Sequence, residues 1–427
     1  MLKQDPKYTA YVQILKEELI PAMGCTEPIA LAYGAAVARE TLGCMPDKVT
    51  AKVSGSIIKN VKSVIVPNTE RLKGIPAAIT AGIVAGRADR ELEVIASVTP
   101  AQIAEMRTFL DKVPIITEHI DNGFVFEIDL ALHAGENYAR VRIVNFHTNI
   151  ILIEKNGEIL LSKEAVSDTQ DTVRVDRSLL NMESIWDFAM TVDTADVEET
   201  LDRQIRCNTA IADEGLRGDW GANIGKVLLQ VYGNDVRNRA KARAAAGSDA
   251  RMNGCEMPVI INSGSGNQGI TCSVPVIEYA EELQVGREKL LRALVLSNLT
   301  AIHQKTGIGT LSAYCGAVSA ATGAGAAITY LCGGGYKEMI HTIVNSVAIV
   351  SGMVCDGAKA SCAAKIASAV DAAILGYEMY VHGQQFRRGD GLVVGDVEAT
   401  IRGIGQLSKE GMRETNNEII RLMVTGC

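Results

Sequence analysis

The chain has 427 residues, of which 47% are apolar and only 4% aromatic, and it contains 40 glycines. This length allows roughly two or three domains, and so many glycines favour helices that pack closely through small aliphatic side chains. The formal net charge of -8 argues against a nucleic-acid-binding protein, because affinity for phosphate backbones depends on clustered Lys and Arg.

The sequence shows neither a secretion signal nor a membrane segment. Charged residues interrupt the apolar positions of residues 1–21, and many Gly, Ser and Thr dilute the uncharged stretch from Thr306 to Tyr336. A signal peptide needs a continuous apolar core, and a membrane helix needs about 20 mostly apolar residues. We therefore expect a cytoplasmic protein without a membrane partner.

The first part of the chain predicts an α+β fold. Helical spacing of apolar residues at 8–20 precedes a Gly-Cys-Thr-Glu-Pro turn at 24–28 and an Ala-rich helix at 29–41. From residue 48 onwards β-strand patterns dominate, interrupted by a helix at 76–87. The predicted strands are 49–53, 91–98, 124–132, 138–146 and 149–154. They should form a mostly antiparallel sheet that ends near residue 170.

Beyond residue 179 almost every segment predicts a helix. These helices are 179–192, 194–216, 285–304, 311–331, 338–352, 361–376 and 408–425. The predicted organisation is N-terminal helices over 1–42 that pack on the helical domain, an α+β domain over 43–175 and an all-helical domain over 176–427. A glycine-rich helical domain commonly buries one face against a copy of itself, so we expect a homodimer.

Ten cysteines are candidate metal ligands, reactive thiols or small core residues, because without a secretion signal they should be reduced. On one straight helix, Cys355 and Cys362 would lie about 10 Å apart along the axis, which is too far for one cluster. We therefore expect Cys355 on a loop that doubles back at Gly357, with Cys362 opening the next helix. The helix dipole favours a thiolate at that position.

Cys315, 40 positions before Cys355, is a third candidate ligand. Three thiolates would hold a 4Fe-4S cluster and leave one iron without a protein ligand, as an open Lewis acid. Zinc would need a fourth Cys or a His, and His341 and His382 lack ligand-type spacing. Spacing alone leaves ordinary buried cysteines as the alternative.

Four short segments form a recognisable set. They are Gly24-Cys25-Thr26-Glu27-Pro28, Ser248-Asp249-Ala250-Arg251-Met252, Asn262-Ser263-Gly264-Ser265-Gly266-Asn267-Gln268-Gly269-Ile270 and Cys355-Asp356-Gly357-Ala358-Lys359. In this order they resemble the L-cysteine desulfidase family, a distant relative of the iron-sulfur L-serine dehydratase alpha chain. The similarity runs from about residue 10 to residue 425.

The resemblance implies a 4Fe-4S enzyme that converts L-cysteine to sulfide, ammonia and pyruvate without pyridoxal phosphate. It implies that Cys315, Cys355 and Cys362 hold the cluster, which makes 176–427 the catalytic domain. Two departures concern the third ligand: its spacing from Cys355 is shorter than in the dehydratase relatives, and Gly357 stands where they have Pro.

Cys25 lies in the most family-specific segment, and three roles are open for it. It is a candidate for the general base that removes the substrate's Cα proton, for a cluster ligand in place of Cys362, and for a packed turn residue. A thiolate there could be populated near neutral pH beside a cluster and a helix N-terminus. Glu27 is interpreted as a helix-capping carboxylate.

Candidate substrate-binding residues come from two parts of the chain. The Gly/Ser-rich loop offers backbone N–H groups and short polar side chains that suit an α-carboxylate. Two clusters from the first domain recur in the family and are expected to complete the site. By themselves the loop would be an ordinary turn and His147 a core histidine. The candidates are Lys59, Asn60, His147, Asn149, Ser263, Ser265, Asn267 and Gln268.

Three alternative functions are considered. A relative could act on L-serine or another β-substituted amino acid. A pyridoxal-phosphate lyase is suggested by Lys59 and Gly333-Gly334-Gly335, but the order and spacing of these elements are wrong for it. A non-catalytic iron-sulfur sensor would use the same cysteines, but the chain shows no output module.

Overall fold

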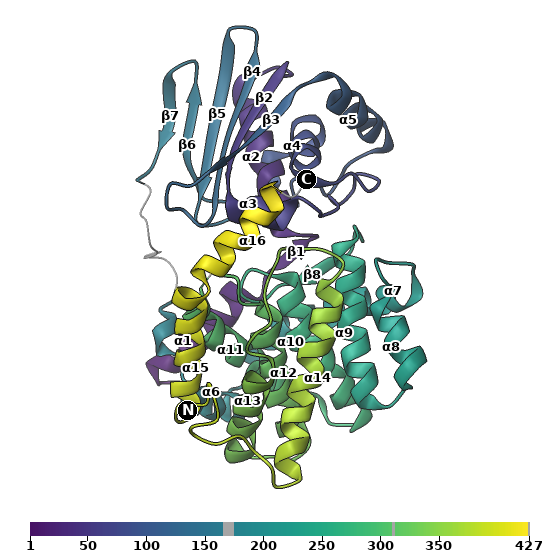
Figure 1. Cartoon of the computed structure of the whole chain (residues 1–427), viewed down its shortest axis with the longest axis vertical. Helices are drawn as coiled ribbons and strands as arrows, with labels where there is room; N and C mark the ends of the chain where they lie inside the picture. The colour runs from purple at the N-terminus through teal and green to yellow at the C-terminus, as the bar shows by residue number, and fades with distance from the viewer. Residues whose placement is uncertain (165–174, 310–311, 426–427) are drawn as a thin grey trace.

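A computed structural model describes residues 1–164, 175–309 and 312–425 (Figure 1). A sheet with its covering helices occupies one end of the molecule, and a larger group of helices occupies the other. Each part has its own apolar core. The predicted α+β class is confirmed, while the domain boundaries at residues 42 and 175 stay a prediction.

The six-stranded sheet has the order β3-β2-β4-β5-β6-β7. β2 pairs in parallel with β3, and the other neighbours pair antiparallel, which confirms the mostly antiparallel sheet. Alternate residues such as Val49, Leu130 and Val141 are buried, as expected where helices cover one face. The strands are β2 (Lys48–Ser54), β3 (Ile115–Ile120), β4 (Glu127–Ala134), β5 (Asn137–Val144), β6 (Ile150–Lys155) and β7 (Glu158–Ser162).

The predicted strand at 91–98 is wrong. The chain there forms the short 3-10 helix η1 (Ala88–Glu93), and Val94 and Ile95 are buried against the core of the sheet domain. Arg87 N–H donates to the Val94 carbonyl, so the segment closes on itself instead of joining the sheet. The edge strand is β3, whose Thr117, Glu118 and His119 are exposed and lack the alternation that marks a half-buried strand.

Helices cover one face of the sheet. α2 (Thr26–Leu42) packs directly on β4 and β5, α4 (Gly74–Ala85) packs on α2, and α5 (Pro100–Lys112) packs on α4. The short α3 (Gly55–Val61) continues from the end of β2. Both N-terminal helices were expected to pack on the helical part. Only α1 (Pro6–Glu18) does so, because the buried face of α2 belongs to the core of the sheet domain.

The second part is almost entirely helical, as predicted. Its helices are α6 (Met182–Thr191), α7 (Glu198–Arg217), α8 (Ile224–Tyr232), α9 (Val236–Met252), α10 (Gly266–Glu282), α11 (Arg287–Ile308), α12 (Gly316–Leu331), α13 (Tyr336–Val350), α14 (Cys362–Val381), α15 (Val397–Gln406) and α16 (Arg413–Thr425). Small residues allow close contacts: a Cβ on Gly323 of α12 would lie 2.4 Å from the Ser297 carbonyl oxygen of α11. Among the described helices, none is long and apolar enough to cross a membrane.

Among the described residues, β1 (Pro21–Met23) and α16 are two of the segments that contact both parts. β1 pairs antiparallel with β8 (Pro258–Ile260), with Ala22 opposite Val259, an exception to the all-helical prediction. α16 follows a π-helical turn at Leu407–Gly411 and crosses from the helical part to α3 (Figure 1). There Lys59 donates to Asn416 Oδ1 at 2.7 Å. Segments from both parts therefore meet at one place.

Asp249 of α9 makes a pH-dependent contribution to stability. Its carboxylate accepts the Ile224 N–H at 2.7 Å, and burial raises its pKa to about 6. The folded chain thus binds this proton more tightly than the unfolded chain, so the free energy of unfolding falls as pH rises from about 4 to 6. We expect Asp249→Asn to remove this fall. Between pH 4 and 7, the free energy of unfolding of the variant relative to that of the wild type should therefore increase by up to about 3 kcal/mol. Urea denaturation at both pH values tests this, and an unchanged difference would contradict it.

Candidate active site

Cys315 and Cys355 are held side by side by a short backbone bridge. Tyr314 pairs antiparallel with Val354, the Cys315 N–H donates to Met353 O at 3.1 Å, and the Cys355 N–H donates to Ala313 O at 2.6 Å. Cys315 is the N-cap residue of α12. Two cysteines that lie 40 positions apart are therefore fixed next to each other by main-chain hydrogen bonds.

Cys362 is the first residue of α14, and Cys355 lies on the preceding loop, as the sequence predicts. Gly357 turns the chain with φ +96°, a left-handed conformation that favours glycine. Lys365 of α14 donates to Val354 O at 2.9 Å and pairs with Asp356, which ties the loop to the helix. The Cys362 thiol donates to Gly357 O at 3.5 Å.

Gly357→Ala should disrupt this loop. A Cβ there would lie 2.0 Å from the Lys59 carbonyl oxygen, so the loop must move away from α3. We expect Gly357→Ala to destabilise the chain by more than the roughly 1 kcal/mol that left-handed backbone costs a non-glycine residue, and to lower iron uptake. The matched control is Gly333→Ala, because Gly333 has φ +91° and nothing within 4 Å of its Cβ position. Equal stability and iron uptake in the two variants would contradict this account.

Cys25 caps α2 and is 1% exposed. It packs against Met252, Val64 and Cys362, and its thiol donates to the Met252 sulfur at 3.9 Å. The neighbouring Arg251 donates to Gly24 O at 2.9 Å and to Asn267 Oδ1 at 3.2 Å. Through Arg251, α9 thereby connects the turn of Cys25 with the first turn of α10.

These segments enclose a cavity of about 150 Å³. It brings together all but one of the site residues predicted from the sequence. The exception is Asn149, whose side chain instead donates to Val144 O at 3.0 Å in the sheet. The predicted residues that line the cavity are Cys25, Lys59, Asn60, His147, Ser263, Ser265, Asn267, Gln268, Cys315, Cys355 and Cys362.

The cavity has an electropositive frame. The N-termini of α2, α10, α12 and α14 all reach it, and each helix dipole favours negative charge at that end. Lys59, Arg251 and Lys305 add cationic side chains to its wall. Such a frame suits both thiolate ligands and the carboxylate of a small molecule.

Burial favours the protonated form of three of the cavity thiols, those of Cys25, Cys315 and Cys362. Burial raises the pKa of Cys315 to about 12, with a further increase from Cys355, and burial also raises the pKa of Cys362. Burial raises the pKa of Cys25 to about 12 although Arg251 opposes this. A populated Cys25 thiolate was expected, and burial works against it. Because bound metal must displace thiol protons, metal affinity should increase with pH.

Three thiols around one cavity fit an iron-sulfur cluster better than a single ion. Within residues 1–164, 175–309 and 312–425, no three His, Cys, Asp or Glu side chains converge closely enough to hold one metal ion. A single zinc needs its sulfur ligands at about 2.3 Å, whereas a 4Fe-4S cluster presents separate irons to separate thiolates. The thiol donors that line the cavity are the ligand type that an iron-sulfur cluster takes.

Sequence reasoning did not assign a role to two cationic residues of the cavity. Lys305 ends α11, and burial lowers its pKa to about 8 while Cys355 and Cys315 oppose this change. The only signal for it is its position as the last charged residue before the uncharged stretch. Arg251 belongs to a family-specific segment, but its contacts with Gly24 and Asn267 cannot be read from the sequence.

Other predicted residues lie around the entrance from the sheet domain. His147 meets Phe126 edge-to-face, with ring centroids 4.9 Å apart. Lys59, proposed under the pyridoxal-phosphate alternative, lines the cavity, whereas the Gly333-Gly334-Gly335 segment does not. The elements that the alternative requires are therefore not brought together.

Comparison with known proteins identifies the family of this chain. The family described as serine dehydratase alpha chain matches residues 89–421. The chain is 58% identical to a UPF0597 protein of Desulfitobacterium hafniense over 100% of this chain and 99% of the relative. It is 53% identical to a UPF0597 protein of Lachnoclostridium phytofermentans, with 98% and 100% covered. A UPF0597 protein of Treponema denticola is 46% identical, with 98% of each chain covered. The chain therefore belongs to the serine dehydratase alpha chain family.

Proposed function

We propose that this chain is an iron-sulfur-dependent lyase that eliminates the β-substituent of L-cysteine. The observation that carries the proposal is the convergence of Cys315, Cys355 and Cys362 on one small cavity, opposite a helix N-terminus rich in Ser, Asn and Gln. The overall reaction converts L-cysteine and water to sulfide, ammonia and pyruvate.

The three cysteines would hold the cluster, each from a different structural position. Cys315 caps α12, Cys355 lies on the bridged loop and Cys362 opens α14. When bound, a 4Fe-4S cluster with one open iron supplies a Lewis acid that stabilises the departing sulfur. The family match supports this cofactor.

The substrate carboxylate would lie at the N-terminus of α10. Ser265 caps this helix, and Asn267 and Gln268 follow in its first turn, so the N-terminus of the helix and polar side chains line the same part of the cavity. Lys59, across the cavity, adds positive charge from the sheet domain. Together these residues would orient the Cα–H bond of a small amino acid.

Cys25 is the proposed base that takes the Cα proton. It lines the cavity at the start of α2, in contact with Cys362. Because its pKa is about 12 without a bound ligand, it needs positive charge nearby to ionise, and Arg251 on the adjoining turn supplies some. Proton removal with loss of sulfide leaves aminoacrylate, which takes up water to give pyruvate and ammonia.

A cavity of about 150 Å³ limits the substrate to a small amino acid. L-serine is the second candidate, and the serine dehydratase family description favours it. The test is anaerobic reconstitution with iron and sulfide, followed by assay of pyruvate from each amino acid and of sulfide from L-cysteine. We expect a higher kcat/KM for L-cysteine. Faster pyruvate formation from L-serine would reverse the assignment, and no product from either would refute the lyase.

A further inference from the structure

A second cavity, of about 770 Å³, lies in the helical part and shares no lining residue with the cysteine cavity. It is partly open to solvent and is lined by residues of α1, α6, α13 and α15 and of the loop between α14 and α15. These elements lie at the end of the molecule that faces away from the sheet (Figure 1). The volume is within the range of roughly 300–1,000 Å³ that is typical of small-molecule sites.

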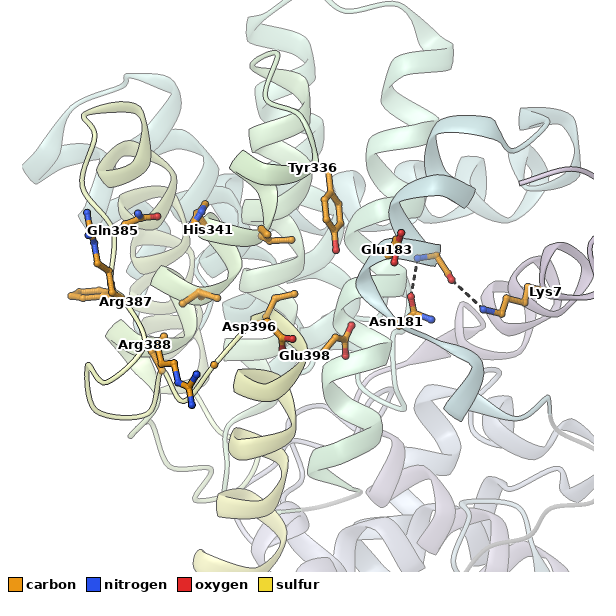
Figure 2. Close-up of a pocket in the computed structure, with 17 residues that line it drawn as sticks. Lys7, Asn181, Glu183, Tyr336, His341, Gln385, Arg387, Arg388, Asp396 and Glu398 are labelled. Carbon is orange, nitrogen blue, oxygen red and sulfur yellow. Dashed lines mark hydrogen bonds between the residues drawn. The ribbon is translucent and has the colours of Figure 1, made fainter.

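One side of this cavity is cationic. Figure 2 shows Arg387 and Arg388 on the α14–α15 loop, beside Gln385. The loop is built around Asp390, which accepts the Arg387 N–H at 2.6 Å, and around a 2.9 Å bond from Gly389 N–H to Val393 O. Within the described part of the chain neither guanidinium group forms an ion pair, although the chain has an excess of acidic residues.

The opposite side carries the carboxylates of Glu183 and Asp396 together with the ammonium group of Lys7, and aromatic rings lie between the two sides. Glu183 opens α6 and forms no ion pair among the described residues, and Asp396 caps α15 (Figure 2). Tyr336 and His341 line the space between them, and the His341 ring stacks on Tyr380 at 4.9 Å. A ligand there would meet a cationic end, flat side walls and an anionic end.

We propose that this cavity binds a small zwitterionic molecule whose carboxylate and ammonium groups are separated by more than one carbon. The carboxylate would pair with the arginines, and the ammonium group would pair with Glu183.

The walls of this cavity continue into elements of the cysteine cavity. Glu398 of α15 meets His303 Nε2 at 2.9 Å, and His303 lies two residues before Lys305 on α11. Beyond α15, Ser408 O accepts the Ser312 hydroxyl at 3.1 Å, and Ser312 lines the cysteine cavity. Binding of the zwitterion would therefore alter the positions of α15 and α16, so the cavity is also proposed as an effector site.

Isothermal titration calorimetry of the unreconstituted full chain tests the site without relying on the lyase activity. The probes are glycylglycine, pyruvate and ethylamine, which represent the zwitterion, the anion and the cation. We expect glycylglycine to bind with one site per chain and more tightly than the other two. We expect Arg387→Gln with Arg388→Gln, and separately Glu183→Gln, to weaken this binding at least tenfold.

Arg206→Ala is the matched control, because Arg206 is an exposed arginine of α7 that lines neither cavity. Any of three results would refute the proposed site: wild-type affinity for glycylglycine in the Arg387/Arg388 double variant, tighter binding of pyruvate than of glycylglycine, or no binding of glycylglycine at millimolar concentration. Hydrogen–deuterium exchange tests the connection. Protection of residues 397–423 by glycylglycine supports the effector role, and protection confined to 382–396 refutes it.

Discussion

Replacing Cys315 by alanine is expected to abolish both iron binding and turnover. Cys315 is a proposed ligand that is buried, and its position is fixed by the helix it caps and by its hydrogen bond to Met353. Two remaining thiolates cannot hold a cluster that needs three protein ligands to leave one iron open. Iron and acid-labile sulfide should fall to background after anaerobic reconstitution, and pyruvate formation should fall by at least roughly 10⁴-fold, because metal polarisation and proton transfer are lost together.

The control for this variant is Cys272→Ala. Cys272 is also a fully buried thiol of the helical part, but it lies outside the cysteine cavity. It should lose some stability because a core sulfur is removed, yet bind iron as the wild type does. Full iron content in Cys315→Ala, or equal iron loss in Cys272→Ala, would show that Cys315 is not a cluster ligand.

Replacing Cys25 by alanine is expected to separate catalysis from cluster binding. If Cys25 removes the Cα proton, the variant should keep its iron and lose about 10²- to 10⁴-fold in kcat, the range typical of general acid–base catalysis. Iron content, the visible spectrum and kcat measured on the same sample decide between the three roles. Loss of iron would make Cys25 a ligand, and near wild-type kcat would make it a packed turn residue.

Met252→Leu is the control for the packing role of Cys25. It removes the sulfur that accepts the Cys25 thiol but preserves an apolar side chain of similar volume. A small change in kcat there, beside a large one in Cys25→Ala, would assign the effect to the thiol itself. Similar losses in both variants would instead indicate that the shape of the turn matters.

Local patterns predicted much of the fold. The alternation in 49–53 and the helical spacing after residue 179 identify real elements, and the distance argument for Cys355 and Cys362 correctly placed one on a loop and the other at the start of α14. The predictions of secondary structure fail where contacts between distant residues determine the local structure. Residues 91–98 alternate like a strand but turn back on themselves, and β3 is an exposed edge strand whose polar side chains show no pattern.

The site was predictable only where family-specific segments mark it. Those segments contain Cys25, Cys355 and the loop before α10, and the resemblance to the dehydratase relatives added Cys315 and Cys362, but Lys305 carries no such mark. Its role depends on α11 ending at the cavity, which follows from packing between distant helices. Asn149 shows the opposite error: it is a polar residue near His147, but its side chain closes a turn of the sheet at Val144.

The central claim is that Cys315, Cys355 and Cys362 together hold one cluster with an open iron. The most direct measurement is Mössbauer spectroscopy, with iron quantification, of the anaerobically reconstituted chain before and after addition of L-cysteine. We expect about four irons per chain, with the signal of a single iron changed by the amino acid, and no iron in the variant with all three cysteines replaced by serine. Iron binding that survives the triple replacement, or a cluster whose irons are all indifferent to L-cysteine, would contradict it.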